Sequence, residues 1–227
     1  MHVDHFHRSG YAILPAMLGA TALGEVDTAL YHTSADTPGA RQMLAFGWCA
    51  SLAGQLRLQL VAAGLIPSDF VSVQCTYFEK SRDHNWLVAP HQDLSIPVGA
   101  RCAHPGLTGW SEKHGMLFVQ PPAAVLEQLV ALRLHIDECT CDDGALNVVP
   151  GSHLHGRLRD ADKAQRRAAS GVVRCPVAAG GGMVMRPLLL HASSKATGTS
   201  RRRVLHFLFG PPNLPYGLAW PQPAQQV

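Results

Sequence analysis

The sequence has no long uninterrupted hydrophobic segment. A transmembrane helix needs about 20 mostly apolar residues, and the longest candidate, near Leu44–Leu65, is interrupted by Gln55, Arg57 and Gln59. The opening stretch, MHVDHFHRSG, also lacks the apolar core of a secretory signal peptide. From these two absences we expect a cytoplasmic protein that does not cross a membrane.

Charged residues are also scarce. Asp, Glu, Lys and Arg together make up 15% of the chain, and the formal net charge is only +3. This small positive excess does not by itself imply a nucleic-acid partner, and we expect none. The most basic stretch, Arg157–Arg167, also contains Asp160 and Asp162 and is typical of a solvated helical face. An apolar fraction of 47% excludes wholesale disorder.

Cysteine pairs with the usual metal-site spacing are missing. None of the six cysteines forms a C-x-x-C motif, and the one close pair is Cys139 and Cys141. In a cytosolic chain such cysteines are expected to be free thiols. Histidine, in contrast, is abundant, with thirteen residues. A histidine-based metal site is therefore worth seeking.

The order of predicted elements favours one domain. A chain of 227 residues is within the range of a single β-barrel or sandwich. We expect a helical part over about 1–67, a β-rich core over about 68–210 and a tail over 211–227. Apolar spacing near four predicts one helix beginning near Gly19–Leu23 and another over Arg41–Gly64.

Short apolar segments between Gly and Pro predict the strands of the core. These segments are Val71–Phe78, Leu132–Asp137, Ala145–Pro150, Gly171–Val177, Gly182–His191 and Arg203–Gly210. Asp143-Gly144 is a tight-turn signal between two of them. The pattern predicts a barrel or a two-sheet sandwich buttressed by helices.

Two histidines and one aspartate stand out as candidate metal ligands. His91 and Asp93 form an H-x-D motif, and residues two apart on an extended segment point to the same face. His191 ends a predicted strand, and the Arg201–Arg203 run opens the next one. Two histidines and one carboxylate are the ligand set of non-haem iron(II) oxygenases, which leaves coordination positions open for an oxo-acid and dioxygen.

Four segments resemble the phytanoyl-CoA dioxygenase family of iron(II)- and 2-oxoglutarate-dependent oxygenases, which includes ectoine hydroxylase. They are FHRSGYAILPAML, PHQDL, DDGALNVVPGSHLHG and LLLHASSKATGTSRRRVLHFLF. They occur in the order and at the spacing of the family, and the resemblance covers most of the chain. The resemblance implies a mainly β fold with a double-stranded β-helix core (jelly-roll, cupin-like) buttressed by N-terminal helices.

The resemblance also implies roles for individual residues. His91, Asp93 and His191 would bind iron and form the catalytic centre. Arg202, eleven residues after His191, would hold the distal carboxylate of 2-oxoglutarate, for which a bidentate guanidinium is suited. Ser193 matches a serine that also contacts 2-oxoglutarate. The position of Gln74 resembles that of a glutamine that binds the cosubstrate in ectoine hydroxylase.

Strand periodicity adds candidates beyond the motifs. Arg133 and His135 share the polar face of their strand, which we expect to line the cavity. A buried Arg133 needs an anion, which could be the cosubstrate, an acidic substrate or a neighbouring carboxylate such as Asp137. Trp86 and Trp110, in loops that flank the H-x-D motif, are candidate substrate contacts, and so is His135.

The implied reaction is hydroxylation of a small-molecule metabolite with Fe(II), 2-oxoglutarate and O2, releasing succinate and CO2. The presence of Asp93 favours hydroxylation over halogenation, because related halogenating enzymes have a small residue there. Desaturation and other oxidative outcomes stay open, and we expect a small substrate that is polar or anionic. Two alternatives remain: a non-catalytic protein that binds metal and 2-oxoglutarate, and an oxygenase that acts on a macromolecule. No oligomeric state follows from the sequence.

Overall fold

The computed structural model describes residues 2–34, 39–82, 84–198 and 201–221. In this part of the chain the α-helices are α1 (His2–Ser9), α2 (Ala20–Ser34), α3 (Gly47–Ala62), α4 (Ala123–Leu126) and α5 (Asp160–Ser170), and the 3-10 helices are η1 (Met43–Ala45), η2 (Cys141–Asp143) and η3 (Ser152–His155). The strands are β1 (Tyr11–Leu14), β2 (Gly39–Ala40), β3 (Val71–Lys80), β4 (Val88–His91), β5 (Ile96–Val98), β6 (Thr108–Lys113), β7 (Met116–Gln120), β8 (Val130–His135), β9 (Leu146–Val148), β10 (Val173–Cys175), β11 (Gly182–Met185), β12 (His191–Ser193) and β13 (Arg202–Gly210).

A six-stranded antiparallel sheet forms the centre of the molecule, in the order β1-β11-β8-β13-β3-β2. Its longest pairing joins β13 to β3, from Arg202 opposite Lys80 to Gly210 opposite Val71. β8 pairs with the other side of β13, and every residue of β8 is buried. A strand covered on both faces needs few polar positions, so the two polar side chains of β8, Arg133 and His135, are exceptional.

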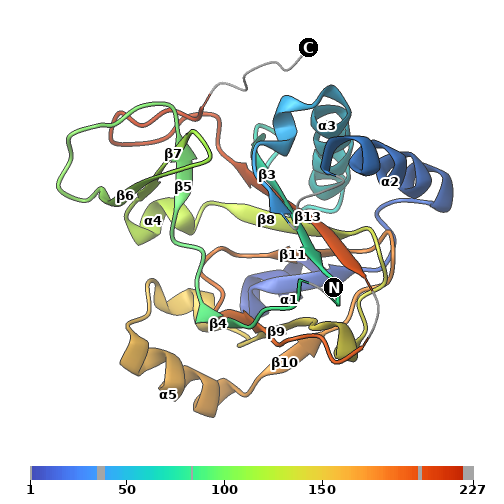
Figure 1. The fold of residues 1–227 in the computed structure, drawn as a ribbon. Coiled ribbons are helices and arrows are strands. Elements are labelled where there is room, and N and C mark those ends of the chain that lie inside the picture. Colours follow the sequence, from blue (N-terminus) through green and yellow to red (C-terminus); the bar gives the residue numbers. More distant parts are fainter. Residues whose placement is uncertain (1, 35–38, 83, 199–200, 222–227) are drawn as a thin grey trace.

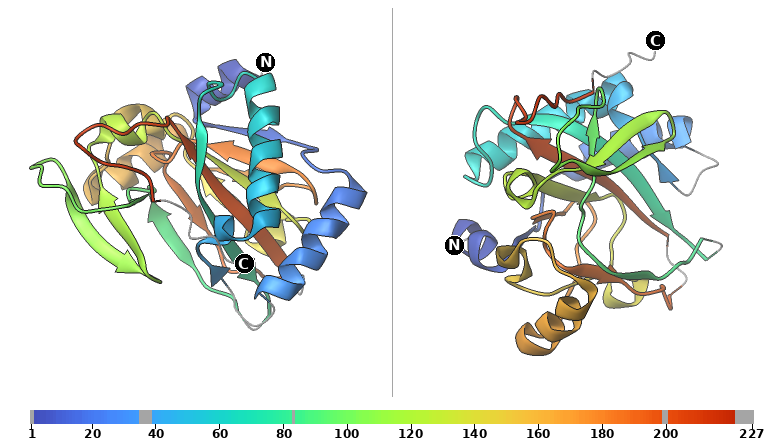
Figure 2. Two further views of the ribbon diagram at one scale, coloured as in Figure 1. Left: turned by 90° about the horizontal axis from the view of Figure 1, so that it is seen from above. Right: turned by 90° about the vertical axis from the view of Figure 1, so that its left-hand side faces the viewer.

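A four-stranded sheet, in the order β10-β9-β12-β4, faces the six-stranded sheet, and β5, β7 and β6 form a small third sheet. Figure 1 shows α2 and α3 on the outer side of the six-stranded sheet and α5 beyond the four-stranded sheet. Figure 2 shows the same layers from two further directions. Two facing antiparallel sheets with helices outside confirm the predicted jelly-roll core.

The hydrophobic core has two parts, one on each face of the six-stranded sheet. Between this sheet and the helices, Leu52, Leu56 and Leu60 of α3 pack against Leu132 and Leu134 of β8, among others. The second part fills the space between the sheets. The spacing of four in α3 places these leucines on one helix face, as the sequence predicts.

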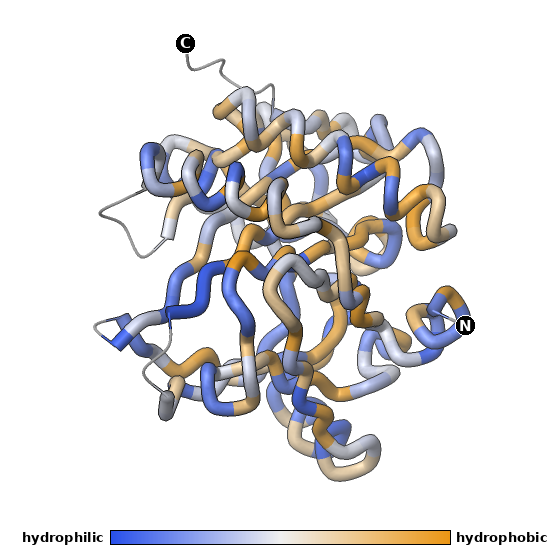
Figure 3. Tube along the Cα trace, turned by 90° about the vertical axis from the view of Figure 1, so that its right-hand side faces the viewer, coloured by the Kyte–Doolittle hydropathy of each residue, from blue (hydrophilic) through white to orange (hydrophobic). Residues whose placement is uncertain are grey.

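Hydrophilic and hydrophobic residues alternate along the chain rather than gathering into one long hydrophobic segment (Figure 3). None of the helices in the described residues is both long enough and apolar enough to cross a membrane. All six cysteines are free, and Cys49, Cys75, Cys139 and Cys175 are buried.

The predicted strand Gly182–His191 is wrong as a single element. β11 ends at Met185 in the six-stranded sheet, and β12 begins at His191 in the four-stranded sheet. Between them Pro187 lacks a backbone N–H for pairing, and the Leu189 amide donates to the Arg186 carbonyl at 3.0 Å in a turn. The chain thus passes from one sheet to the other immediately before the distal histidine.

Two helical expectations are also corrected. The segment Arg41–Gly64 is not one helix, because Gln42 adopts a left-handed conformation with φ 65°, and α3 begins only at Gly47. The first residues form helix α1, which the sequence analysis did not predict. In the tail, the Trp220 indole donates to the Pro211 carbonyl at 2.8 Å, whereas residues 222–227 lie outside the described part of the chain.

Candidate metal and cosubstrate site

The three candidate metal ligands lie together between the two facing sheets. His191 at the start of β12 is paired directly with His91 at the end of β4. Asp93 is two residues beyond His91, and its amide donates to the Pro187 carbonyl at 2.9 Å. One ligand atom from each of the three side chains lies within 4.8 Å of the other two. Strand pairing and the extended H-x-D segment therefore bring the triad together.

Gln92, between two of these residues, points the other way and anchors the segment. Its side-chain amide donates to the Leu188 carbonyl at 2.7 Å and to the Gly156 carbonyl at 2.8 Å. Its side-chain oxygen accepts from the Leu158 amide at 2.8 Å. Gln92 is buried, so its three hydrogen bonds fix the backbone that carries the candidate ligands. The sequence analysis missed this role.

The triad geometry fits a metal ion better than it fits direct hydrogen bonds. The His91 Nε2 atom lies 3.7 Å from Asp93 Oδ1, and the His191 Nε2 atom lies 3.9 Å from Asp93 Oδ2. Both distances exceed the range of a hydrogen bond. Each histidine donates its Nδ1–H to a backbone carbonyl at 2.9 Å, of Ala89 and Leu189 respectively. This directs both Nε2 lone pairs toward Asp93, as metal-binding histidines require.

The electrostatic surroundings keep the aspartate ionised. Burial opposes ionisation of Asp93, but the surrounding positive charge, which includes that of Arg133, outweighs it, so the pKa of Asp93 lies below its usual value. An ionised carboxylate and two neutral imidazoles are the ligand set that divalent iron accepts.

A second cluster, of cations and hydroxyls, lies on one side of the triad. Lys80 donates its Nζ protons to Ser193 Oγ at 2.7 Å and to the Ser194 carbonyl at 2.8 Å. Ser193 in turn donates to the Gly144 carbonyl at 2.7 Å. Arg202 donates an Nη1 proton to the same carbonyl, while its buried Nε has no partner among the described residues.

This cluster contains two buried cations that have no carboxylate partner among the described residues. Lys80 is 1% exposed and Arg202 is 4% exposed. Burial, and then the charges of Arg202 and Arg133, lower the pKa of Lys80 to about 8. Buried like charges are unfavourable unless an anion joins them. The cluster therefore has the properties of a carboxylate-binding site.

Lysine is usually a surface residue, but Lys80 is buried. Its strand, β3, alternates Gln74, Thr76, Phe78 and Lys80 along the cavity side. Because residues two apart on a strand share a face, Lys80 follows Gln74 onto the cavity side. What sequence could not show is that β3 pairs with β13, which puts Lys80 opposite Arg202.

The other two arginines of the run are engaged elsewhere. Arg201 forms a two-point ion pair with Glu79, at 2.8 and 2.9 Å, near the surface. Arg203 pairs with Asp137 through Nε at 2.8 Å and Nη2 at 2.7 Å, and also with Asp27. Period two along β13 thus directs only Arg202 into the cavity.

Arg133 lies on the floor of the cavity, buried and partly unsatisfied. Its Nη1 lies 3.2 Å from His206 Nδ1, and its Nε has no partner among the described residues. Burial, and then Arg133, lower the pKa of His206 to about 3, so this imidazole is neutral and accepts the bond. The Arg133 guanidinium also lies 5.9 Å from the Phe78 ring centroid.

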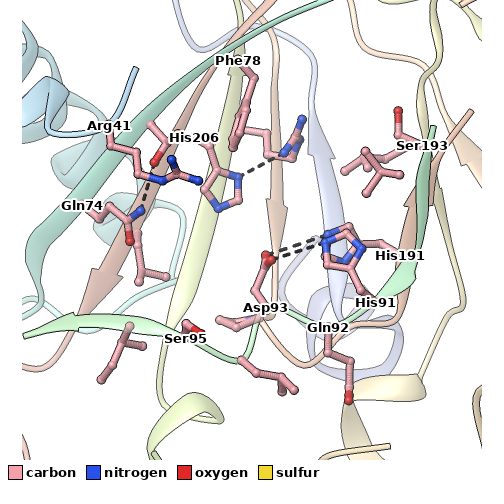
Figure 4. A pocket seen from close by; sticks show the side chains of 18 of the residues that line it. Arg41, Gln74, Phe78, His91, Gln92, Asp93, Ser95, His191, Ser193 and His206 are labelled. Carbon is pink, nitrogen blue, oxygen red and sulfur yellow. Dashed lines mark hydrogen bonds and ion pairs between the residues drawn. The ribbon is translucent and has the colours of Figure 1, made fainter. Parts of the chain in front are cut away.

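The remaining candidates divide between the cavity and its surroundings. The cavity has a volume of about 360 Å³, and its lining includes Trp86, Gln74 and Arg41. Gln74 donates to Thr76 at 3.0 Å and lies across the triad from Ser193 (Figure 4). Trp110 instead packs against Arg101, whose Cζ atom lies 5.1 Å from the centroid of the Trp110 ring. His135 is 4% exposed and is not among the residues that line the cavity, so the expectation that it lines the cavity is wrong.

Comparison with known proteins identifies the fold and the family. The family model described as phytanoyl-CoA dioxygenase (PhyH) matches residues 6–204. Among solved structures, EctD from S. alaskensis in its apoform gives a TM-score of 0.69 at 15% identity and covers 98% of this chain and 84% of its own. No match was found among curated protein sequences.

Two other solved structures have a similar fold, one of an epimerase and one with a metal ion and 2-oxoglutarate bound. The non-haem α-ketoglutarate-dependent epimerase SnoN from nogalamycin biosynthesis gives a TM-score of 0.68 at 17% identity, covering 96% of this chain and 84% of its own. HygX from Streptomyces hygroscopicus, with nickel and 2-oxoglutarate bound, gives 0.63 at 17% identity, covering 92% and 85%. At these identities the likeness establishes the shared fold.

Proposed function

The chain belongs to the phytanoyl-CoA dioxygenase family of iron(II)- and 2-oxoglutarate-dependent oxygenases, and on that premise we propose that it hydroxylates a small-molecule metabolite. The observation that carries the proposal is the geometry of His91, Asp93 and His191, whose ligand atoms converge without hydrogen-bonding one another. A cavity of about 360 Å³ is the size of a small-molecule site.

We assign the iron ligands to His91 Nε2, His191 Nε2 and an Asp93 carboxylate oxygen. The donor set fits Fe(II): two imidazoles held in the correct tautomer by backbone carbonyls and one ionised carboxylate. Three protein ligands leave the remaining coordination positions for the oxo-acid and dioxygen.

Arg202, Lys80 and Ser193 are the residues that we assign to the distal carboxylate of 2-oxoglutarate. The unpartnered Nε of Arg202 and the ammonium of Lys80 supply donors, and both are anchored through the Ser193–Gly144 hydrogen bonds before any ligand arrives. Arg133 lies near Asp93 and adds positive charge for the rest of the dianion. Preorganised charges of this kind bind without reorganisation.

When bound, iron with 2-oxoglutarate supplies oxidation of a substrate C–H bond by dioxygen, with release of succinate and CO2. The residues of the protein hold the reacting groups in place. The Gln92 hydrogen bonds hold the H-x-D segment, and the Lys80–Arg202 cluster orients the cosubstrate. Such positioning restricts oxidation to one substrate bond.

An anaerobic titration of metal-free protein with Fe(II) and then 2-oxoglutarate tests the proposal. We expect a visible charge-transfer band that needs both additions and is absent in Asp93→Ala. Asp160→Ala, which removes an exposed carboxylate of α5 that does not line the cavity, is the control and should keep a band. If wild-type protein gives no band although it binds 2-oxoglutarate, the chelate that we propose does not form.

A further inference from the structure

The cavity contains more positive charge than its cosubstrate requires. Among the described residues that line it, Asp93 is the one carboxylate, whereas five side chains are cationic: Arg41, Lys80, Lys113, Arg133 and Arg202. In the proposed function, Lys80, Arg202 and Arg133 balance the two negative charges of the cosubstrate. Arg41 and Lys113 therefore face a cavity in which no described carboxylate balances them. Unbalanced charge of one sign in a cleft attracts ligands of the opposite sign.

Arg41 differs from a freely moving surface arginine because its backbone is fixed on both sides. It directly follows β2, which pairs with β3 at Phe78 and Tyr77. The next residue, Gln42, has φ 65° and donates its side-chain amide to the His114 carbonyl at 2.6 Å. A left-handed non-glycine residue is uncommon and is strained unless its surroundings hold it. The β2–β3 pairing and the Gln42 hydrogen bond therefore hold the backbone that carries Arg41.

Arg41 and Gln74 lie on one side of the metal triad and Ser193 lies on the other (Figure 4). The cosubstrate cluster is on the Ser193 side, through Lys80. The Arg41 side is therefore left for the substrate that is oxidised.

The cavity also has apolar walls. Its lining includes buried side chains from β5, β7, α4, the turn after α4 and β13, namely Ile96, Phe118, Leu126, Leu129 and Leu208. Apolar walls with few polar groups are typical of small-molecule sites, in which the polar groups fix orientation. A ligand that satisfies both features has an apolar body and one anionic end.

We propose that the substrate is a small carboxylic acid with an apolar body, and that Arg41 binds its carboxylate. The inference rests on the proposed oxygenase function and specifies its substrate class. A planar guanidinium donates two parallel hydrogen bonds to a carboxylate. The apolar body then lies against the leucines and Phe118, near the metal triad.

Calorimetry on protein loaded anaerobically with Fe(II) and 2-oxoglutarate tests this without turnover. The probes are hexanoate, octanoate and decanoate and their three primary amides, which have the same apolar body but no charge. We expect at least one acid to bind about tenfold or more tightly than its amide, the range for a charge-assisted hydrogen bond. Arg41→Gln should remove this preference and leave 2-oxoglutarate affinity within about twofold of wild type.

Lys113→Gln is the matched control, because Lys113 is a second cation at the cavity and lies over the Phe118 ring at 5.5 Å. It should keep most of the preference for acids. If both variants lost the preference for acids equally, the cause would be the general electrostatic field of the cavity and not a site at Arg41, and the proposal would be overturned. Equal binding of acids and amides, or no binding of any acid, by protein that binds 2-oxoglutarate would also overturn the proposal. Failure to bind 2-oxoglutarate would instead overturn the proposed function. Thermal unfolding of both variants checks that they fold.

Discussion

The three consecutive arginines at the start of β13 allow the cosubstrate assignment to be tested with internal controls. Arg201, Arg202 and Arg203 have the same chemistry and adjacent backbone positions but three different environments. Only Arg202 faces the cavity. Replacing each in turn with lysine preserves the positive charge and removes the planar, two-point donor geometry. We expect Arg202→Lys to weaken 2-oxoglutarate binding and the other two to leave it nearly unchanged.

The expected magnitudes follow from the contacts of each residue. Arg202→Lys should lose about one charge-assisted hydrogen bond to the cosubstrate, about 1.5–3 kcal/mol, or about 10- to 150-fold in the dissociation constant. Arg203→Lys loses part of a two-point pair with Asp137 and should reduce the free energy of unfolding by about 1–3 kcal/mol. Arg201 is half-exposed, and its replacement should cost less than about 1 kcal/mol.

Two measurements separate these effects. Calorimetry of iron-loaded protein gives the 2-oxoglutarate dissociation constant, and chemical denaturation gives the free energy of unfolding. The reasoning predicts that Arg202→Lys changes mainly the first and Arg203→Lys mainly the second. Equal weakening of 2-oxoglutarate binding in all three variants would refute the assignment of Arg202. Loss of stability without loss of affinity in Arg202→Lys would refute it as well.

Three further outcomes follow from the site. Asp93→Ala should abolish Fe(II) binding in equilibrium dialysis and leave the circular dichroism spectrum unchanged; retained binding would exclude Asp93 as a ligand. Because burial lowers the pKa of Lys80 to about 8, its charge is present below that pH and is lost above it. The 2-oxoglutarate dissociation constant should therefore rise above about pH 8, and a pH profile that is equally steep in Lys80→Met would contradict this. Gly144→Ala should lower the free energy of unfolding by at least about 1 kcal/mol, because Gly144 has φ 69° and a Cβ there would lie 2.5 Å from the Ser194 carbonyl oxygen; unchanged denaturation would contradict it.

Local patterns in the sequence predicted the parts of the site that depend on local geometry. The H-x-D motif needs only an extended backbone for His91 and Asp93 to share a face. The period of two on β8 likewise predicted Arg133 on the polar face, and the structure has it lining the cavity. These predictions needed no knowledge of strand order.

The parts that sequence could not predict depend on contacts between distant segments. Lys80 and Ser193 are 113 residues apart in the chain, and they meet only because β3 pairs with β13 and β12 lies in the facing sheet. Arg41 enters the cavity because the short β2 pairs with β3, although apolar spacing predicted a helix there. At Arg41, tertiary pairing outweighed local propensity.

Gly144 shows how a local signal can set the chemistry of a distant cluster. The Asp143-Gly144 pair predicts a turn, and the structure has Gly144 in the left-handed conformation at the end of η2. That conformation directs the Gly144 carbonyl to accept from both Ser193 and Arg202. The two side chains are thereby oriented before any carboxylate binds, while the Arg202 Nε has no partner among the described residues. A side chain at this position would displace the Ser194 backbone, which also accepts from Lys80. Because one glycine carbonyl aligns donors from β12 and β13, Gly144 variants that still fold should lose cosubstrate affinity while keeping Fe(II) affinity.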